Sequence, residues 1–262
     1  MKKLLAIALM AIMLVGCFAG CGKKDETKKL LVATNAEFEP FESLDADGNL
    51  VGFDIDLMDA IAEKLGYEVK YENMEFDGVV AAVANGTCDA AISGLTINPT
   101  RAKSVNFTNA YYTGAAQILI VGANDTYFTG KTIEELDEQL KNQKIGVCSG
   151  FTGQAYAEGD EEWEFKKIEG AAISIYENIS LAIADIKSGN INVIIMDDSV
   201  AKEAAAANSD VAKVIDVPLT VEEYGIAIEK GNDQLKNDVN KALKELVEDG
   251  TVAGLLAKYE LN

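Results

Sequence analysis

Strands and helices alternate along the chain from about residue 29 to its end, and this order constrains the fold more than any other feature of the sequence. Short apolar runs predict strands, and longer segments with an apolar residue every three or four positions predict helices. Strands are expected at 30–34, 67–71, 89–93, 117–121, 144–148, 192–196, 211–215 and 224–228, and helices at 54–65, 76–84, 132–142, 174–188, 199–208 and 232–248, with a last helical turn to 261. Such alternation is typical of α/β proteins with mostly parallel sheets and helices on both faces.

Several helix ends carry residues that favour starting or stopping a helix. Gly66 is placed to end the first long helix, because glycine readily adopts the left-handed conformation found there. Asn98 and Pro99 favour a helix N-terminus, which puts Arg101 in the first turn of that helix. A glycine-bearing turn at 149–153 leads into a further helix.

The first residues form a separate targeting segment. Two lysines precede an apolar run that is too short to span a bilayer as a permanent helix, which predicts a secretory signal peptide. Small residues precede both Cys17 and Cys21, and each stretch resembles the bacterial lipoprotein box, in which the cysteine becomes lipidated. Residues 1–21 are therefore expected to be signal peptide and lipobox, and 22–28 a polar tether. Either cysteine would anchor the exported protein to the outer face of the membrane.

The composition excludes several classes of function. The net charge of −20 disfavours nucleic acid and anionic lipid headgroups as partners. With no histidine and no Cys-x-x-Cys pair, neither a zinc site nor a Ser-His or Cys-His nucleophile is expected. The turns at Gly94 and Gly150 match neither a P-loop nor a dinucleotide-binding motif, so no cofactor is expected.

Arg101 is the only arginine in a chain with 22 lysines. A site that must hold a planar carboxylate in one direction favours the guanidinium group, which stays charged and offers two parallel donors. Just upstream, Ser93, Gly94 and Thr96 offer hydroxyl groups and bare backbone to the same ligand. A lone arginine is more often a surface residue, and the rest of the chain decides between the two interpretations.

The segment 52–65, GFDIDLMDAIAEKL, resembles the signature of the extracellular solute-binding proteins of family 3, which serve polar amino-acid importers. The similarity covers about 29–262 and is carried further by 37–41, 89–101, 105–112 and 193–200.

This resemblance implies a two-lobed fold like that of the type 2 periplasmic binding proteins. Two α/β lobes would be joined by two crossing hinge segments, with the ligand held between the lobes. Lobe 1 would comprise 29–110 and 225–262, lobe 2 would comprise 116–219, and the crossings would lie at 111–115 and 220–224.

The resemblance also implies roles for individual polar residues. Arg101 matches the residue that pairs with the α-carboxylate of the ligand, and Asp197 matches the acidic partner of its α-ammonium group. Thr96 matches a hydroxyl that bonds the same zwitterion, and Gly94 matches a carbonyl that accepts from the ammonium group. Thr152 lies where lobe 2 offers a hydroxyl and helix N-terminal amides to an anion.

These residues also have plainer interpretations. Asp197 could cap the helix expected from Ser199, as could Asp198. Thr96 and Thr152 could be turn hydroxyls that are satisfied locally.

The implied side-chain pocket is fairly apolar. Asn35 stands where family members that bind basic amino acids tend to carry an aspartate, and an amide does not neutralise a cation, although Glu37 could turn inward. Phe38 and Phe76 match the aromatic walls of the family's pocket, and Phe151 is a further aromatic candidate. Cys148 and Met196 stand at positions that often contact the ligand side chain. Neutral ligands with apolar, sulfur-containing or aromatic side chains are therefore expected.

The resemblance implies a receptor rather than an enzyme. We expect a lipid-anchored monomer that delivers an amino acid to the membrane permease and ATPase subunits of an ABC importer. The alternative is an enzyme similar to the cyclohexadienyl dehydratases, which resemble these receptors. Glu37 or Glu39 would then act as the general acid.

Overall fold

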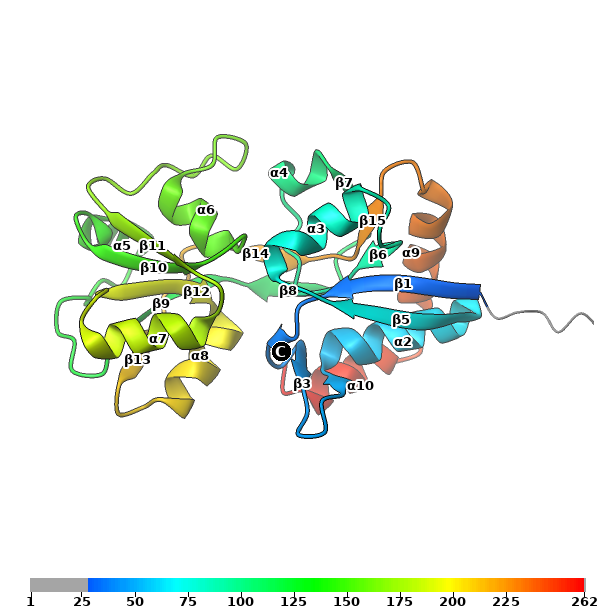
Figure 1. Ribbon diagram of the computed structural model, residues 1–262, viewed down its shortest axis with the longest axis horizontal. Helices are drawn as coiled ribbons and strands as arrows, with labels where there is room; N and C mark the ends of the chain where they lie inside the picture. Colours follow the sequence, from blue (N-terminus) through cyan, green and yellow to red (C-terminus); the bar gives the residue numbers. More distant parts are fainter. Residues whose placement is uncertain (1–27, 262) are drawn as a thin grey trace, which may run out of the picture.

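The computed structural model describes residues 28–261 as an elongated protein with two α/β lobes (Figure 1). The expected fold class, two α/β lobes joined side by side, is confirmed. The predicted signal peptide, both candidate lipidation cysteines and nearly all of the predicted tether lie outside the described residues. Within the described part of the chain, no helix is both long enough and apolar enough to cross a membrane.

Lobe 1 is built on a five-stranded sheet in the order β5-β1-β6-β15-β7. Its strands are β1 (Lys28–Thr34), β5 (Tyr67–Asn73), β6 (Ala90–Ala91), β7 (Val105–Phe107) and β15 (Ala227–Glu229). Its helices are α2 (Phe53–Leu65), α3 (Phe76–Ala84), α4 (Pro99–Ala102), α9 (Asp233–Glu248) and α10 (Thr251–Lys258). A small antiparallel sheet beside α2 consists of β2 (Glu37–Phe38), β3 (Glu42–Leu44) and β4 (Leu50–Val51).

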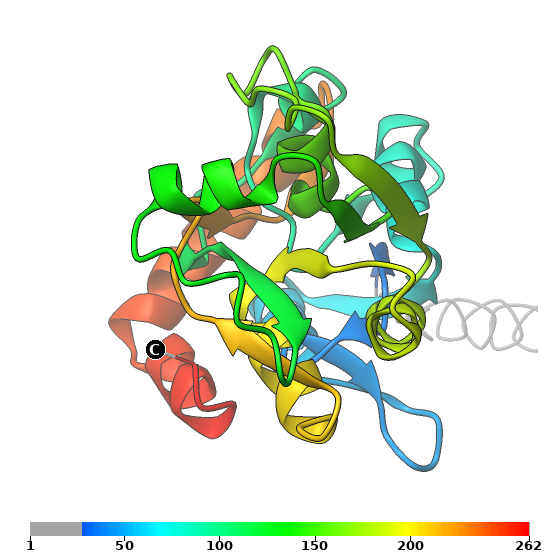
Figure 2. The ribbon, with the colours of Figure 1, turned by 90° about the vertical axis from the view of Figure 1, so that its left-hand side faces the viewer.

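Lobe 2 is built on a second five-stranded sheet in the order β11-β10-β12-β9-β13. Its strands are β9 (Gln117–Gly122), β10 (Lys144–Cys148), β11 (Ala172–Tyr176), β12 (Val193–Asp197) and β13 (Ala212–Ile215). Its helices are α5 (Ile133–Leu140), α6 (Thr152–Glu158), α7 (Ile179–Ser188) and α8 (Asp198–Ala207). Figure 2 looks at the molecule from this end and shows α5 and α8 on opposite sides of the sheet.

Two short strands connect the lobes. β8 (Tyr112–Ala115) and β14 (Glu222–Tyr224) pair antiparallel with each other and lie within the predicted crossings (Figure 1). The chain therefore enters lobe 2 and returns to lobe 1 along one narrow two-stranded sheet.

In each large sheet four strands run in one direction and one strand runs against them, which agrees with the expectation of mostly parallel sheets. In lobe 1, β1 runs parallel to β5 and β6, whereas β15 runs antiparallel to β6 and β7. In lobe 2, β10 runs parallel to β11 and β12, whereas β9 runs antiparallel to β12 and β13. β9 and β15 are the strands that follow the two crossings, so each enters its lobe from the opposite end and runs against its neighbours.

Two element predictions are wrong in part. The helix expected at 174–188 begins only at Ile179, because 172–176 forms β11 and Asn178 caps α7 by accepting a hydrogen bond from Leu181 N. The strand expected at 224–228 is divided between β14 in the crossing and β15 in lobe 1. Short strands such as β7 and β8 were not predicted, since two to four residues carry too little periodicity to be recognised.

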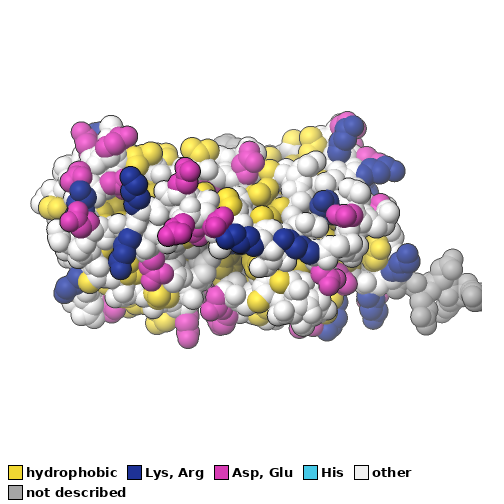
Figure 3. Space-filling model, turned by 90° about the horizontal axis from the view of Figure 1, so that it is seen from above, with side chains coloured by type: hydrophobic (Ala, Val, Ile, Leu, Met, Phe, Trp, Pro, Cys, Tyr) yellow, Lys and Arg dark blue, Asp and Glu magenta, His cyan; other side chains and the backbone are white. Residues whose placement is uncertain are grey.

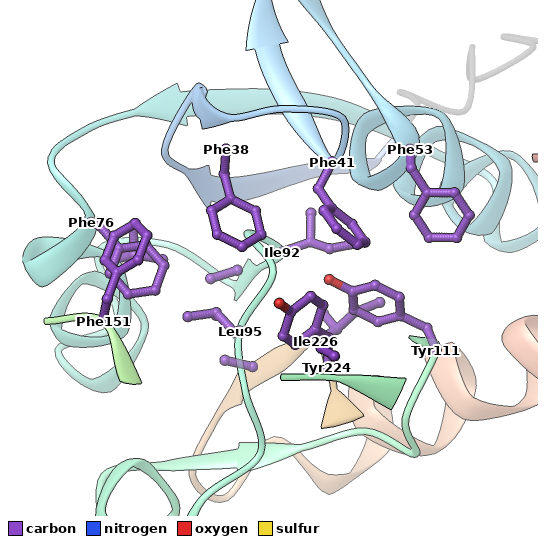
Figure 4. Packing of buried hydrophobic residues seen from close by; sticks show 14 of the residues in the cluster. Phe38, Phe41, Phe53, Phe76, Ile92, Leu95, Tyr111, Phe151, Tyr224 and Ile226 are labelled. Carbon is purple, nitrogen blue, oxygen red and sulfur yellow. The ribbon is translucent and has the colours of Figure 1, made fainter. Parts of the chain in front are cut away.

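Aromatic packing holds the junction of lobe 1 with the crossings. The ring of Tyr224 lies 5.3 Å from that of Phe41 and 6.1 Å from that of Phe38, between centroids. Figure 4 shows these rings facing Tyr111 and Ile226 in one cluster of buried side chains. Edge-on and tilted aromatic pairs of this kind contribute about 0.5–1.5 kcal/mol each beyond their buried area.

Charged side chains are spread over the surface. In Figure 3, Asp and Glu side chains are interspersed with Lys on both lobes of one face. Ion pairs such as Lys64–Asp249, at 3.1 Å, and Lys258–Asp56, at 2.6 Å, are solvent-exposed. Exposed pairs contribute about 0–1 kcal/mol each, so the surface charge favours solubility more than stability.

Candidate functional site

Most of the predicted site residues line one small space between the lobes. In this arrangement of the lobes the space is too narrow for a water molecule, and it is lined by Phe38, Phe76, Gly94, Thr96, Arg101, Phe151, Thr152 and Asp197. Lobe 1 contributes the first five residues and lobe 2 the last three. The structure therefore brings together side chains that lie far apart in the sequence.

Three aromatic rings form one wall of this space. The rings of Phe76 and Phe151 lie 4.2 Å apart, and that of Phe38 lies 5.8 Å from Phe151, between centroids. Figure 4 shows Phe151 reaching from lobe 2 to Phe76 and Phe38 of lobe 1. The guanidinium carbon of Arg101 lies 5.3 Å from the centroid of the Phe76 ring, so this ring also contacts the cation.

Arg101 bridges the two lobes. Its side chain is half-buried, Nη1 donates to the carbonyl oxygen of Thr96 at 3.0 Å, and Nη2 donates to that of Gly150 in lobe 2 at 3.0 Å. Burial lowers the pKa of the guanidinium group, and the nearby charges of Glu222 and Asp197 act in the opposite direction. Arginine keeps its charge under these conditions, so the cleft contains a fixed cation.

Asp197 lies at the end of β12 and its carboxylate faces the cleft. Although Asp197 occupies the N-cap position of α8, its side chain makes no capping hydrogen bond, so the plainer capping interpretation is wrong. Its Oδ1 accepts from the hydroxyl of Tyr224 at 2.8 Å. Burial, followed by the negative charge of Glu222, raises the pKa of Asp197 to about 7.

Glu222 is a buried residue of the site region that the sequence analysis missed. Its Oε2 accepts from the hydroxyls of Thr96, at 2.6 Å, and Thr152, at 3.0 Å. Its Oε1 accepts from the hydroxyl of Thr220, at 2.6 Å, and from Nε2 of Gln117, at 3.1 Å. The two threonines of the site are thus satisfied by a carboxylate and not by a local turn. The available signal was the alternation at 220–224, which puts Thr220, Glu222 and the core residue Tyr224 on one face of a strand.

Gly94 needs to be a glycine. Its φ is +50°, and a Cβ atom there would lie 2.4 Å from Cε1 of the Phe38 ring. Its N–H donates to Oδ2 of Asp54 at 2.8 Å. This hydrogen bond fixes one side of the loop to lobe 1, and the opposite side of the loop faces the cleft. The adjacent Ser93 is turned into lobe 1, where its hydroxyl donates to Glu42 at 2.6 Å and accepts from Asn35 N at 3.1 Å.

Four predicted residues do not line the space: Ser93, Asn35, Cys148 and Met196. Asn35 Nδ2 donates to the carbonyl of Met74 at 2.9 Å, and Met196 is fully buried in the core. Burial, followed by the charges of Asp197 and Glu37, raises the pKa of the Cys148 thiol to about 12, so this buried side chain behaves as a small apolar group.

Glu37 and Glu39 also lie elsewhere. Both are exposed and line an outer groove together with Ile183, Val200 and Glu203 of lobe 2. Burial and the charges of neighbouring acidic residues raise the pKa of Glu37. Neither carboxyl group reaches the space lined by the three phenylalanines.

The arrangement is suited to holding a small zwitterion. It sets the cation Arg101 and the acid Asp197 in one enclosed space, with aromatic walls beside them. No hydroxyl of the site is paired with a basic residue that could make it a nucleophile among the described contacts.

Comparisons with known proteins agree with this geometry. The model of the bacterial extracellular solute-binding proteins, family 3, matches residues 30–262. A probable histidine-binding protein of Neisseria gonorrhoeae is 32% identical over 99% of this chain and 96% of its own length. The arginine-binding extracellular protein ArtP of Bacillus subtilis is 33% identical, over 99% and 98%. The L-cystine-binding protein TcyJ of Escherichia coli is 30% identical, over 97% and 92%.

Solved structures give the same result. An ancestral arginine-binding protein bound to glutamine superposes with a TM-score of 0.75 at 35% identity, over 88% of this chain and 97% of the other. The ancestral amino acid-binding protein AncCDT-1, a precursor of cyclohexadienyl dehydratase, gives a TM-score of 0.73 at 33% identity, over 96% and 98%. The three relatives named above are binding proteins named for histidine, arginine and cystine. From its sequence match, its two-lobed fold and its interlobe cleft, the chain belongs to the bacterial extracellular solute-binding proteins, family 3.

Proposed function

We propose that this protein is a lipid-anchored receptor outside the cytoplasm, which binds a neutral amino acid between its lobes and passes it to an ABC importer. The observation that carries the proposal is the enclosed interlobe space in which Arg101 and Asp197 stand beside three phenylalanine rings. The permease and ATPase subunits of the importer are the expected partners, and the receptor works as a monomer.

The charged groups fit the common part of every amino acid. The fork of Arg101 binds the α-carboxylate, and ligand binding replaces the carbonyl contacts that the guanidinium makes in this structure. Asp197 binds the α-ammonium group. A zwitterion therefore finds a counter-charge for each end, which its transfer out of water requires.

The remaining walls favour a neutral side chain. Among the residues that the structure describes, Arg101 and Asp197 are the charged ones that line the space, and both are used by the zwitterion. The side chain of the ligand then meets Phe38, Phe76 and Phe151. Apolar, sulfur-containing and aromatic side chains suit these rings, and the cystine-binding relative supports this class. Two relatives are named for histidine and arginine, so the decisive comparison is between neutral and basic amino acids.

Binding is coupled to closure of the lobes. We propose that the crossings at 111–115 and 220–224 act as the hinge, since β8 and β14 are the strands that pair between the lobes. The interlobe contacts of Arg101 with Gly150, and of Phe76 with Phe151, require the lobes to be close together. Closure would give the importer a distinct state to recognise.

Lipidation of Cys17 or Cys21 would hold the receptor near its importer. The apolar run before these cysteines and the polar tether after them support an exported, anchored protein. Mass spectrometry of the protein from membranes would identify the modified cysteine.

A ligand screen tests the function. The purified protein is unfolded, dialysed and refolded to remove bound ligand, and its melting temperature is measured with each of the twenty amino acids. We expect a concentration-dependent rise with one or a few neutral amino acids and a smaller effect of arginine, lysine and histidine. Arg101→Lys should weaken binding of each ligand at least tenfold, because the fork is lost. No shift with any amino acid would overturn the proposal.

A dehydratase is the second candidate, favoured by the similarity to AncCDT-1. It requires a general acid over the ligand, and the two acids considered for this role, Glu37 and Glu39, line the outer groove instead. Incubation with prephenate and arogenate, followed by detection of phenylpyruvate or phenylalanine, would distinguish this activity from binding alone.

A further inference from the structure

The hydrogen bonds of Glu222 restrict what the two threonines of the cleft can offer a ligand. A threonine hydroxyl has one hydrogen to donate and two lone pairs with which to accept. A carboxylate has no hydrogen, so a contact between the two must run from the hydroxyl to the carboxylate. Thr96 Oγ1 and Thr152 Oγ1 lie 2.6 Å and 3.0 Å from the same oxygen of Glu222, which therefore takes the hydrogen of each.

The second carboxylate oxygen of Glu222, Oε1, also accepts two hydrogen bonds. Thr220 Oγ1 accepts from the backbone N–H of Gln117 at 2.8 Å, and its own hydrogen points to Oε1 of Glu222 at 2.6 Å. Gln117 Nε2 donates to the same oxygen at 3.1 Å. Glu222 is only 2% exposed, so these four donors and not water satisfy its carboxylate. It is therefore held from lobe 1, lobe 2 and the crossing together.

From these contacts we infer that Glu222 is a positioning residue that makes the hydroxyls of Thr96 and Thr152 acceptors toward the cleft and so selects for the ligand's ammonium group. This inference rests on the proposed function and adds a determinant to it. The hydroxyl oxygens retain lone pairs that can receive an ammonium hydrogen, and they have no hydrogen left for a ligand carboxylate.

The charges around the cleft act in the same direction. Glu222 and Asp197 are two acids near a single arginine, and both affect the guanidinium of Arg101 through their charge. A ligand that brings a carboxylate without an ammonium group adds a third anion and leaves the threonine oxygens without a donor. In a bound zwitterion, Arg101 and backbone amides then bind the carboxylate, and the threonine hydroxyls bind the ammonium group.

The test compares each amino acid with its des-amino analogue, which keeps the side chain and the carboxylate. Dissociation constants are measured by calorimetry for the wild type, with the amino acid that binds most tightly in the screen. The dissociation constant of the des-amino analogue divided by that of the amino acid reports the selection for the ammonium group. Glu222→Met removes the acceptor, Glu222→Gln keeps an acceptor but removes the charge, and Glu223→Gln makes the same charge change at an exposed neighbour.

We expect Glu222→Met to reduce the ratio at least tenfold, because the freed hydroxyls can then donate to the carboxylate. Glu222→Gln and Glu223→Gln should stay within about threefold of the wild type, since an amide oxygen can still accept from both hydroxyls. If Glu222→Met weakens both ligands equally, Glu222 is only a structural support and the inference is wrong. It is also wrong if Glu222→Gln reduces the ratio as much as Glu222→Met, because charge alone would then select the ligand.

Thr96→Val gives a second test that leaves Glu222 in place, in case the methionine variant does not fold. An acceptor role predicts that the amino acid loses at least tenfold in affinity while the des-amino acid loses less than threefold. Equal losses would contradict the inference. If the wild type binds no amino acid at all, the proposed function itself fails, and that outcome is distinct from an unchanged ratio in a protein that binds.

Discussion

At the scale of single residues, a pair of buried acids fixes the loop that carries Gly94. Asp54 Oδ2 accepts from Gly94 N at 2.8 Å and from the hydroxyl of Tyr111 at 2.7 Å, and Glu42 Oε1 accepts from Ser93 at 2.6 Å. Burial raises the pKa of Asp54 to about 7, and burial together with the charge of Asp54 raises that of Glu42. The loop is thus held by acceptors that are costly to ionise.

The acid pair predicts how stability depends on pH. Because the pKa of Asp54 is higher in the folded than in the unfolded chain, the folded protein binds more protons between about pH 4 and pH 7. The free energy of unfolding should therefore fall as the pH rises through this window, by up to about 1.4 kcal/mol per pH unit for one such group. Asp54→Asn should flatten this slope, because an amide keeps an acceptor for Gly94 and does not ionise.

Urea unfolding at several pH values measures the slope. Asp47→Asn, at an exposed turn position, is the matched control and should leave it unchanged. The same slope in Asp54→Asn and the wild type would show that Asp54 does not titrate in this window.

At the scale of elements, the site depends on a helix that is too short to be stable alone. α4 has only four residues, and an isolated helix needs many more to form in water. Asn98 holds it in place, since its Oδ1 accepts from Arg101 N at 2.7 Å. The backbone of Arg101 is thus positioned by a cap and its guanidinium by the carbonyls of Thr96 and Gly150.

Removing this cap should therefore affect binding as well as stability. Asn98→Ala is expected to cost about 1 kcal/mol of stability and to weaken ligand binding several-fold, because the direction of Arg101 is no longer fixed. Asn178→Ala removes the equivalent cap of α7, which does not line the space around Arg101, and should cost similar stability while leaving the affinity unchanged. Calorimetry and thermal unfolding of both variants check this, and an equal change in affinity for the two would contradict it.

At the scale of the whole molecule, the site supplies several of the contacts between the lobes. Arg101 reaches Gly150, the hydroxyls of Thr96 and Thr152 lie 3.3 Å apart, and the rings of Phe76 and Phe151 pack together. Within residues 28–261 the chain passes between the lobes only along the narrow β8–β14 sheet. Opening the cleft would break these contacts without disturbing the core of either lobe.

Ligand removal should therefore change the shape of the molecule. We expect small-angle X-ray scattering to give a larger radius of gyration for the refolded, ligand-free protein than for the same sample after the binding amino acid is added. A non-binding amino acid is the control. A radius that does not change on saturation would mean that the lobes do not move on binding.

Much of the fold could be predicted because its determinants are local. Helix α2 begins one residue before its predicted start and ends at its predicted last residue. Asn98 and Pro99 correctly predicted the start of α4. Such patterns reflect hydrogen bonding and burial within one element. The direction of β9 and β15 could not be found this way, because it depends on how the chain crosses between the lobes.

By itself, the sequence determined the α/β class, the family and most of the residues that line the cleft, since charge, ring size and glycine conformation are properties of single positions. Only the tertiary structure decided which of those side chains meet. It turned Ser93 into lobe 1, kept Glu37 on an outer groove, and brought Glu222 to Thr96 and Thr152. A hydrogen bond between residues 70 or 126 positions apart depends on where two lobes and a crossing place its atoms, and no local pattern encodes that distance.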